Sequence, residues 1–234
     1  MKEVKDNVAL ITGGGRSIGR AIALRFARSR TRLVVASRSL PELEETRRLA
    51  EALGAKCHVR VTDVASPDDI AGLVADTVNH HGRLDILINN AGVAPQAAIE
   101  KMDDSLFHML YTVNMAATFY TCRAAWPHLK KQEGVIVNIS SVAALDPFPG
   151  FAAYGASKAW VNAWTKGLAE EGRPSGIRVF AVAPGAVETR MLRDVFPDFP
   201  KDQSLQPEDV ADVVFALTQP ECRHATGQVV YVKK

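Results

Sequence analysis

The sequence predicts an α/β fold, a doubly wound, seven-stranded parallel sheet with helices on both faces. Seven short apolar runs recur along the 234 residues, and most are continuous in Val, Ile and Leu rather than alternating with polar residues. Continuous runs are typical of strands that are buried on both faces of a sheet. Stretches of helical character separate most of the runs, and this alternation predicts βαβ units.

The predicted strands follow one another without a break in composition. In chain order they are residues 7–12, 32–37, 56–62, 84–90, 134–140, 177–183 and 228–232. The clearest helical stretches between them are residues 20–30 and 41–53. Right-handed crossovers connect such strands by default. The chain has no Gly/Ser-rich linker, low-complexity tract or internal repeat, so we expect a single domain over residues 1–234.

Charge and the N-terminal stretch limit the partners and the location. The formal net charge is +2, with Lys and Arg scattered among Asp and Glu. A nucleic-acid-binding protein has a concentrated basic surface, so we expect no nucleic-acid partner. The stretch MKEVKDNVALITGG holds an apolar run too short for a signal-peptide core or a membrane span. We therefore expect a cytoplasmic protein with no membrane partner.

The cysteines and histidines do not form a metal-binding pattern. Cys57, Cys122 and Cys222 are odd in number and far apart, which favours reduced thiols over disulfides. His80 and His81 are adjacent, and adjacent side chains have poor geometry for binding one metal ion. We therefore predict no metal site.

One interval is irregular. Residues 195–207, VFPDFPKDQSLQP, contain three prolines that discourage a continuous helix. The interval is either a surface connection or, because it lies shortly after the sixth predicted strand, a loop over a site at the end of the sheet.

A glycine-rich turn joins the first strand to the first helix in ITGGGRSIGRAIA, residues 11–23. Such a turn presents backbone N–H groups and the positive end of a helix dipole to a phosphate. A purely structural turn would also use Gly13, Gly14 and Gly15. The G-x-G-x-x-G pattern does not fit, because the sixth position from Gly13 is Ile18. The position between a strand and a helix favours a dinucleotide site.

The end of the second predicted strand indicates which dinucleotide is bound. An NAD-binding site usually has an acidic residue here that accepts a hydrogen bond from the ribose 2′-hydroxyl. The strand instead ends in Ser37, Arg38 and Ser39. A guanidinium binds a 2′-phosphate through charge-assisted hydrogen bonds, and Arg16 in the first turn could approach the same phosphate. Solvated arginines are the alternative. The pattern favours NADP(H).

Tyr154 and Lys158 lie four residues apart in AAYGASKAW, residues 152–160. Positions i and i+4 share a face of a helix. Either they are an ordinary core aromatic and a solvated lysine, or the ammonium lowers the pKa of the phenol from its usual value of about 10. General acid–base catalysis works best when the pKa is close to the working pH. The second alternative predicts a catalytic pair.

Several motifs in the same order resemble the short-chain dehydrogenase/reductase family over residues 6–232. Thr12, Gly13 and Gly19 fit its T-G-x-x-x-G-x-G pattern, whereas Ser17 stands where the family has a glycine. The further matches are Asp63–Val64 in TDV, NNAG at residues 89–92, Asn114 in YTVNMAA, Ser141 in NISSVAAL, the Tyr154–Lys158 pair and PGAVET at residues 184–189.

This resemblance implies a Rossmann fold with a dinucleotide half at about residues 6–92 and a catalytic and substrate half at about residues 93–232. It implies that Tyr154 protonates the carbonyl oxygen, Ser141 hydrogen-bonds that oxygen, Lys158 also binds the nicotinamide ribose, and Asn114 holds a water that links Lys158 to solvent. The implied cofactor-binding residues, with those derived above, are Gly13, Gly15, Arg16, Ser17, Ile18, Gly19, Ser37, Arg38, Asp63, Val64, Asn90, Ala91, Gly92, Tyr154, Lys158, Pro184, Gly185, Val187 and Thr189.

The function expected on this basis is reversible reduction of a ketone or aldehyde with NADPH. The sequence resembles the 3-oxoacyl-carrier-protein reductase group and the carbonyl reductases within the family. The alternative is a non-catalytic NADP-binding, redox-sensing protein. The resemblance also implies a homodimer or homotetramer, formed through helices near residues 105–130 and 152–172. The segment between Thr189 and Glu208 is shorter than in many relatives with a helical lid, so we expect a more open pocket. Candidate apolar contacts at its mouth are Val93, Leu145, Phe148, Phe151 and Met191.

Overall fold

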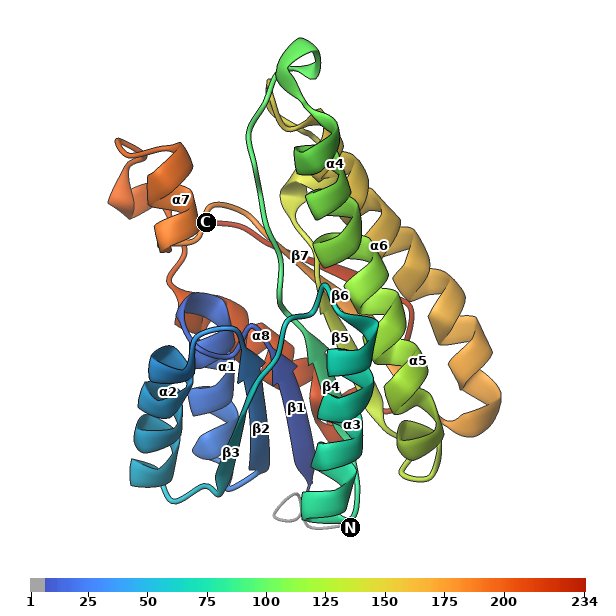
Figure 1. Cartoon of the computed structure of the whole chain (residues 1–234). Helices are drawn as coiled ribbons and strands as arrows, with labels where there is room; N and C mark the ends of the chain where they lie inside the picture. The colour runs from blue at the N-terminus through green and yellow to red at the C-terminus, as the bar shows by residue number, and fades with distance from the viewer. Residues whose placement is uncertain (1–6) are drawn as a thin grey trace.

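A seven-stranded sheet, parallel throughout, forms the centre of the molecule (Figure 1). The structure is a computed structural model that describes residues 7–234. Residue 6, where the family resemblance begins, and most of the polar part of the N-terminal stretch lie outside the described residues. The strand order is β3-β2-β1-β4-β5-β6-β7. The strands are β1 Val8–Thr12, β2 Arg32–Ser37, β3 Cys57–Val61, β4 Ile86–Asn89, β5 Val135–Ile139, β6 Arg178–Pro184 and β7 Val229–Val232.

All seven predicted strands are confirmed, with ends that differ by one or two residues. Every residue of β1, β4 and β5 is buried, as the continuous apolar runs predict. The edge strands β3 and β7 are only partly buried, and β3 has the mixed sequence CHVRV. The two partly buried strands thus form the edges of a sheet whose centre is apolar and buried.

Helices cover both faces of the sheet, which confirms the doubly wound α/β class. On one face α1 Ser17–Ala27, α2 Leu40–Ala52 and α8 Pro207–Thr218 share a buried apolar cluster with the strands. On the other face α3 Pro67–His81, α5 Ala117–Lys130 and α6 Ala152–Gly172 share a second cluster. Leu33 and Val35 of β2 point into the first cluster, whereas Val34 and Ala36 point into the second. Alternate residues of each strand therefore anchor opposite helical layers.

The helical stretch predicted around residues 105–130 is divided into three parts. α4 Asp104–Leu110 passes into a π-helical turn at Tyr111–Ala116 and then into α5, which contains Pro127. π-helical turns inside α-helices often occur at functional sites. Asn114 lies in this turn.

The interval with three prolines does not form a continuous helix, as predicted. α7 Arg190–Val195 ends immediately before Phe196, and only a 3₁₀ turn at Lys201–Gln203 follows before α8. Leu205 pairs with Val187 in an isolated parallel bridge, which returns the segment to the end of β6. The segment therefore forms a short excursion at the carboxyl edge of the sheet (Figure 1).

The strand order reverses direction between β1 and β4, which are neighbours although two strands separate them in sequence. In open α/β sheets, ligands bind in the crevice outside the carboxyl ends of the strands at such a point. The glycine-rich turn follows β1 and the NNAG segment follows β4. The topology thus brings the two sequence motifs to the same place.

Candidate active site

The glycine-rich turn wraps tightly around the start of α1. Gly13 and Ser17 have positive φ angles of 65° and 48°. A Cβ atom on Gly19 would lie 2.1 Å from the carbonyl oxygen of Gly13, so no larger residue fits there. α1 has no side-chain cap from Arg16 and no acidic residue in its first turn. Its N-terminal N–H groups and its dipole are therefore available to an anionic group such as a pyrophosphate.

Asn90 ties the end of β4 to this turn. Its Nδ2 donates to the carbonyl oxygens of Thr12 and Gly13, at 3.0 Å and 3.1 Å. The Thr12 hydroxyl accepts from the backbone N–H groups of Asn90 and Ala91, at 3.1 Å and 3.2 Å. The predicted dinucleotide residues of the first and fourth strands thus form one hydrogen-bonded unit, which explains why an asparagine follows β4.

The end of β2 borders the same turn. The Gly14 N–H donates to the carbonyl oxygen of Ala36 at 3.1 Å. The Ser37 hydroxyl is buried but has no hydrogen-bond partner in the described part of the chain. A buried polar atom without a partner is rare in folded proteins. Ser37 therefore has an unused donor and acceptor beside the turn, as a binding site for a ribose or phosphate requires.

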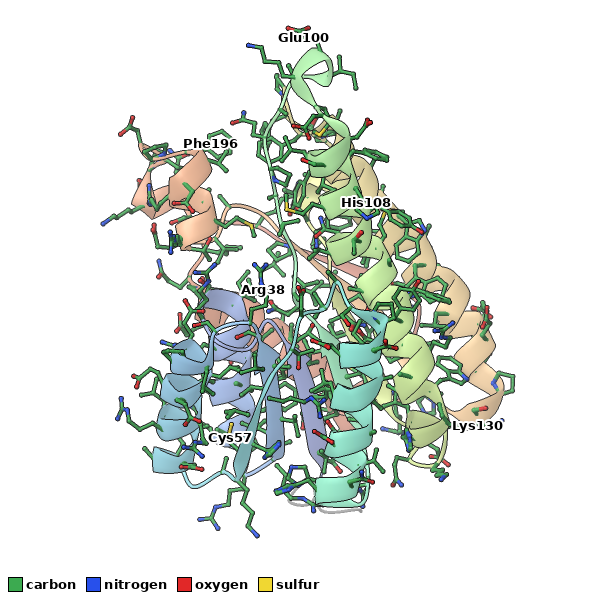
Figure 2. All side chains as sticks on the ribbon, in the orientation of Figure 1. Arg38, Cys57, Glu100, His108, Lys130 and Phe196 are labelled. Carbon is green, nitrogen blue, oxygen red and sulfur yellow. The ribbon has the colours of Figure 1, made fainter. Side chains whose placement is uncertain are left out.

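Arg38 and Arg16 are both exposed at this border. Figure 2 shows Arg38 at the carboxyl edge, above the turn that precedes α1. Arg16 has a partner that the sequence analysis did not identify: its Nη1 lies 3.3 Å from Oε1 of Glu42, in the first turn of α2. The end of β2 has no acidic residue, but the carboxylate of Glu42 in the next helix, α2, thus lies beside Arg16.

The remaining cofactor candidates also lie at carboxyl ends of strands. Asp63 follows β3, half-buried beside Val64, and its Oδ1 accepts from the Ala65 N–H at 3.0 Å. Thr189 caps α7 through a bond from the Leu192 N–H to its hydroxyl at 3.2 Å. Pro184 is the last residue of β6, and Gly185 and Val187 follow it. Ala91 and Gly92, the last two residues of NNAG, follow β4.

Asn114 is buried, with 1% of its surface exposed, and all its polar contacts hold neighbouring segments in place. Its Nδ2 donates to the Val93 carbonyl oxygen at 2.9 Å and to the Ser157 hydroxyl at 3.0 Å, while its Oδ1 accepts from the Val93 N–H at 2.9 Å. The Ser157 hydroxyl donates in turn to the Tyr154 carbonyl oxygen at 2.7 Å. Asn114 therefore connects the segment after β4 to the first turns of α6.

Lys158 is buried although it is cationic. It is 6% exposed, and its Nζ donates to the Ile139 carbonyl oxygen at 2.8 Å, at the end of β5. Burial lowers its pKa from 10.5 to about 8. A Cβ atom on Gly92 would lie 3.3 Å from Asn114 Oδ1 and 3.4 Å from Lys158 Nζ, so these two groups converge on one glycine. Gly92 leaves this space open.

Tyr154 lies one turn before Lys158 on α6, as the spacing predicts. The Lys158 Nζ is 5.9 Å from the centroid of the tyrosine ring. Burial raises the pKa of Tyr154 above 10, and a hydrogen bond with Ser141 acts in the opposite direction with less effect. In the free protein the pKa of this phenol is thus raised, because burial outweighs the hydrogen bond with Ser141. The lowering of this pKa by Lys158 stays a prediction.

Ser141 is positioned by close packing that the sequence analysis missed. It follows β5 and caps a 3₁₀ turn, Val142–Ala144, by accepting from the Ala143 N–H at 3.2 Å. A Cβ atom on Gly155 would lie 2.5 Å from the carbonyl oxygen of Ala143. Gly155, directly after Tyr154, thus lets α6 approach the turn that carries Ser141. The adjacent Ser140 instead donates to the Lys158 carbonyl oxygen at 3.1 Å, which supports Ser141 as the candidate.

Aromatic rings connect the segment after β6 to the loop before α6. Phe196 stacks on Phe151 at 6.0 Å and meets Phe148 edge-on at 6.3 Å, while Phe151 lies 5.6 Å from the Tyr154 ring. Phe151 is buried, whereas Phe148 is 55% exposed, and Leu145, Met191 and the half-buried Val93 are the other predicted apolar contacts. The open pocket stays a prediction. Phe196, labelled in Figure 2, connects the segment that follows α7 to the loop before α6 through its contacts with Phe148 and Phe151.

Residues 7–234 contain no cluster of three or more His, Cys, Asp or Glu side chains that could hold a metal ion. No helix in the same residues is long and apolar enough to cross a membrane.

Comparisons with known proteins agree with the motifs. The sequence model of the short chain dehydrogenases matches residues 7–199. The chain is 35% identical to a 3-oxoacyl-[acyl-carrier-protein] reductase of Thermotoga maritima, over 97% of this chain and 96% of the relative. It is 37% identical to a 2-(R)-hydroxypropyl-CoM dehydrogenase of Xanthobacter autotrophicus, with 95% of each chain covered.

The fold is also similar to that of a solved reductase structure. A crystal structure of a 3-ketoacyl-(acyl-carrier-protein) reductase from Brucella melitensis, complexed with NADH, superposes with a TM-score of 0.90. The two chains are 31% identical, and the similarity covers 98% of each.

Proposed function

The chain belongs to the short-chain dehydrogenase/reductase family and is thus an oxidoreductase of alcohol and carbonyl groups; from this premise we propose that it reduces a ketone or aldehyde with NADPH, reversibly. The observation that carries the proposal is the convergence of Tyr154, Lys158, Asn114 and Ser141 at the carboxyl edge of the sheet. The names of two relatives describe reduction of an oxo group and oxidation of a hydroxyl group, which supports this reaction class.

In the proposed mechanism the nicotinamide group, when bound, supplies a hydride to the carbonyl carbon. The carbonyl oxygen gains negative charge as the C=O π bond breaks, and Tyr154 donates its proton to that oxygen, which gives the alcohol. Because burial raises the pKa of Tyr154, the phenol is protonated in the free protein, so its proton is present when an alkoxide develops. Ser141 hydrogen-bonds the same oxygen and holds it in position, so a donor is already in place where charge develops.

The phenolate left by this step must regain a proton. Lys158, with a pKa of about 8, exchanges protons close to neutral pH, and its ammonium stabilises the phenolate at short range. Asn114 keeps its Oδ1 near Lys158 Nζ on the Gly92 side, where a water could connect the lysine to solvent. In this mechanism Lys158 returns a proton to Tyr154 and binds the ribose. It does not need to lower the pKa of the tyrosine in the free protein.

The preference for NADPH belongs to the proposal as well. It is supported by the exposed guanidiniums of Arg16 and Arg38 and by the unpartnered hydroxyl of Ser37 at the end of β2. The dinucleotide half before Val93 would then hold the cofactor, and the half after it would supply the catalytic groups and the substrate pocket. The apolar mouth supports an apolar small-molecule substrate.

Assembly and location complete the proposal. We expect a homodimer or homotetramer, because α5 and α6 carry a half-buried aromatic group in which Trp160 stacks on Trp164 and Phe119 meets Trp164 edge-on. The free thiols of Cys57, Cys122 and Cys222 support a reducing compartment such as the cytoplasm.

The test is oxidation of NADPH and NADH, side by side, against a panel of ketones, aldehydes and quinones. The proposal predicts turnover on at least one carbonyl compound, with NADPH preferred. Tight NADPH binding without turnover on any compound would instead favour a redox-sensing protein that only binds the dinucleotide.

A further inference from the structure

A carboxylate lies where the dinucleotide turn meets the end of β2. Glu42 belongs to the first turn of α2, yet its Oε1 is 3.3 Å from Arg16 Nη1. A Cβ atom on Gly15 would lie 3.1 Å from Glu42 Cβ and 3.5 Å from its Oε2. The same atom would lie 2.9 Å from the Ser37 hydroxyl. Glu42, Arg16 and Ser37 therefore border one small region of the turn.

The position of Glu42 is fixed by the backbone around it. Arg20 donates to the carbonyl oxygens of Gly15 and Glu42, at 2.5 Å and 3.1 Å, and to the Thr46 hydroxyl at 3.0 Å. The buried Thr46 hydroxyl also lies 3.1 Å from the carbonyl oxygens of Gly14 and Gly15. These bonds join the first turn of α2 to the glycine-rich turn. They fix the backbone of Glu42, whose half-buried side chain faces Arg16.

This region is where the two dinucleotides differ. The residues at the end of the second strand face the adenosine ribose, whose 2′ position carries a hydroxyl in NAD(H) and a phosphate in NADP(H). A carboxylate accepts a hydrogen bond from the hydroxyl but repels the phosphate, whereas a guanidinium attracts the phosphate. The chain holds both groups here, and in the free protein they bind each other.

We propose that Glu42 is a specificity-determining residue that limits the preference for NADP(H) over NAD(H). The Glu42 carboxylate pairs with the Arg16 guanidinium when no phosphate is present. A 2′-phosphate must therefore break this ion pair before it can bind the guanidinium. Glu42 also adds repulsion at the phosphate, and it offers an acceptor to a ribose 2′-hydroxyl. The inference rests on the proposed function for the placement of the dinucleotide, and it deepens the choice of cofactor.

The experiment measures dissociation constants of NADPH and NADH by fluorescence for the wild type and for Glu42→Gln. The glutamine keeps the size of the side chain and removes its charge. We expect NADPH to bind about fivefold more tightly and NADH to bind equally or up to about twofold more weakly, because exposed charges are screened by solvent. The gain for NADPH should shrink at high salt.

Glu45→Gln is the matched control. Glu45 lies on the same helix and also pairs with an arginine, Arg48, at 2.8 Å, and within residues 7–234 its side-chain hydrogen bonds go to Arg48 rather than to the turn. We expect the ratio of the two dissociation constants to stay at the wild-type value in this variant. The inference is overturned if Glu42→Gln changes the ratio no more than Glu45→Gln does, or if it weakens NADPH.

A second pair of probes isolates the phosphate. Adenosine 2′,5′-bisphosphate and adenosine 5′-monophosphate differ only at the 2′ position. We expect Glu42→Gln to tighten binding of the bisphosphate, relative to the monophosphate, by a factor similar to that for NADPH. An unchanged ratio of these two dissociation constants would contradict the inference. Because every readout is binding, a chain that binds both dinucleotides without turnover would end the proposed function and leave this inference standing. If the enzyme turns over a carbonyl compound but Glu42→Gln leaves the ratios of dissociation constants unchanged, this inference is overturned and the proposed function stands.

Discussion

Two buried charged side chains lie at opposite edges of the sheet, and their surroundings differ. Asp85, just before β4 at the amino edge, is 6% exposed and accepts from the Val8 N–H at 2.9 Å and from Arg83 Nε at 2.9 Å and Nη2 at 2.5 Å. Lys158, at the carboxyl edge, is equally buried, but its ammonium donates only to the Ile139 carbonyl oxygen. In residues 7–234 no carboxylate pairs with it.

The difference separates a structural charge from one that is available for chemistry. A buried charge is tolerated when it is paired and hydrogen-bonded, as Asp85 is. An ammonium has three donors, and among residues 7–234 Lys158 has a hydrogen-bond partner for one of them. Burial lowers its pKa, because the charged form loses its solvation without gaining an acidic partner in residues 7–234. We therefore expect buried Lys158, at the carboxyl edge, to lower the free energy of unfolding, and paired Asp85, at the amino edge, to raise it.

The largest expected effect is on chemistry, at Tyr154. Tyr154→Phe removes the proposed acid and keeps the ring against Phe151, so we expect kcat to fall by at least about 1,000-fold. The NADPH dissociation constant and the midpoint of thermal unfolding should change little. Steady-state kinetics and fluorescence titration measure both, and a variant that keeps a tenth of wild-type turnover would exclude the phenol as the acid.

Lys158→Met should separate activity from stability. We expect turnover to fall by at least about 100-fold, while the free energy of unfolding at pH 7 rises by about 2 kcal/mol because an unpaired buried charge is removed. The wild-type lysine has a folded pKa of about 8, below its unfolded value of 10.5, so the penalty is complete below pH 8 and disappears as the pH rises to 10.5. Denaturant unfolding should show the gain shrinking over that range; a variant that is less stable at pH 7 would contradict the comparison.

Asp85→Asn should show the opposite pattern. The substitution removes the carboxylate charge that pairs with Arg83 and accepts from the Val8 N–H, so we expect the free energy of unfolding to fall by about 2 kcal/mol. The values of kcat and KM at 25 °C should stay within about twofold of the wild type, because the residue lies at the far edge of the sheet. A loss of turnover without a loss of stability would break the distinction between the two edges.

The sequence predicted the fold and the main site residues because each depends on local patterns. Continuous apolar runs mark strands such as β4 and β5, and the order of motifs brings Gly13 and Asn90 to neighbouring strand ends. The i, i+4 spacing of Tyr154 and Lys158 was sufficient to place both on one face of α6.

The remaining features depend on contacts between segments that are distant in the sequence. Glu42 reaches Arg16 only because Arg20 and Thr46 join α2 to the glycine-rich turn, and no spacing rule indicates this. Gly155 is important because α6 packs against the turn after Ser141. The direction of the Tyr154 pKa depends on how deeply the ring is buried, which the sequence pattern does not contain.

The most direct test is an NMR titration of the Lys158 side chain in the free protein, with lysine isotopically labelled and the signal assigned by its loss in Lys158→Met. An ammonium that is buried and held by one carbonyl oxygen should titrate with a pKa of about 8. A pKa near 10.5, the value of a solvated lysine, would contradict the account.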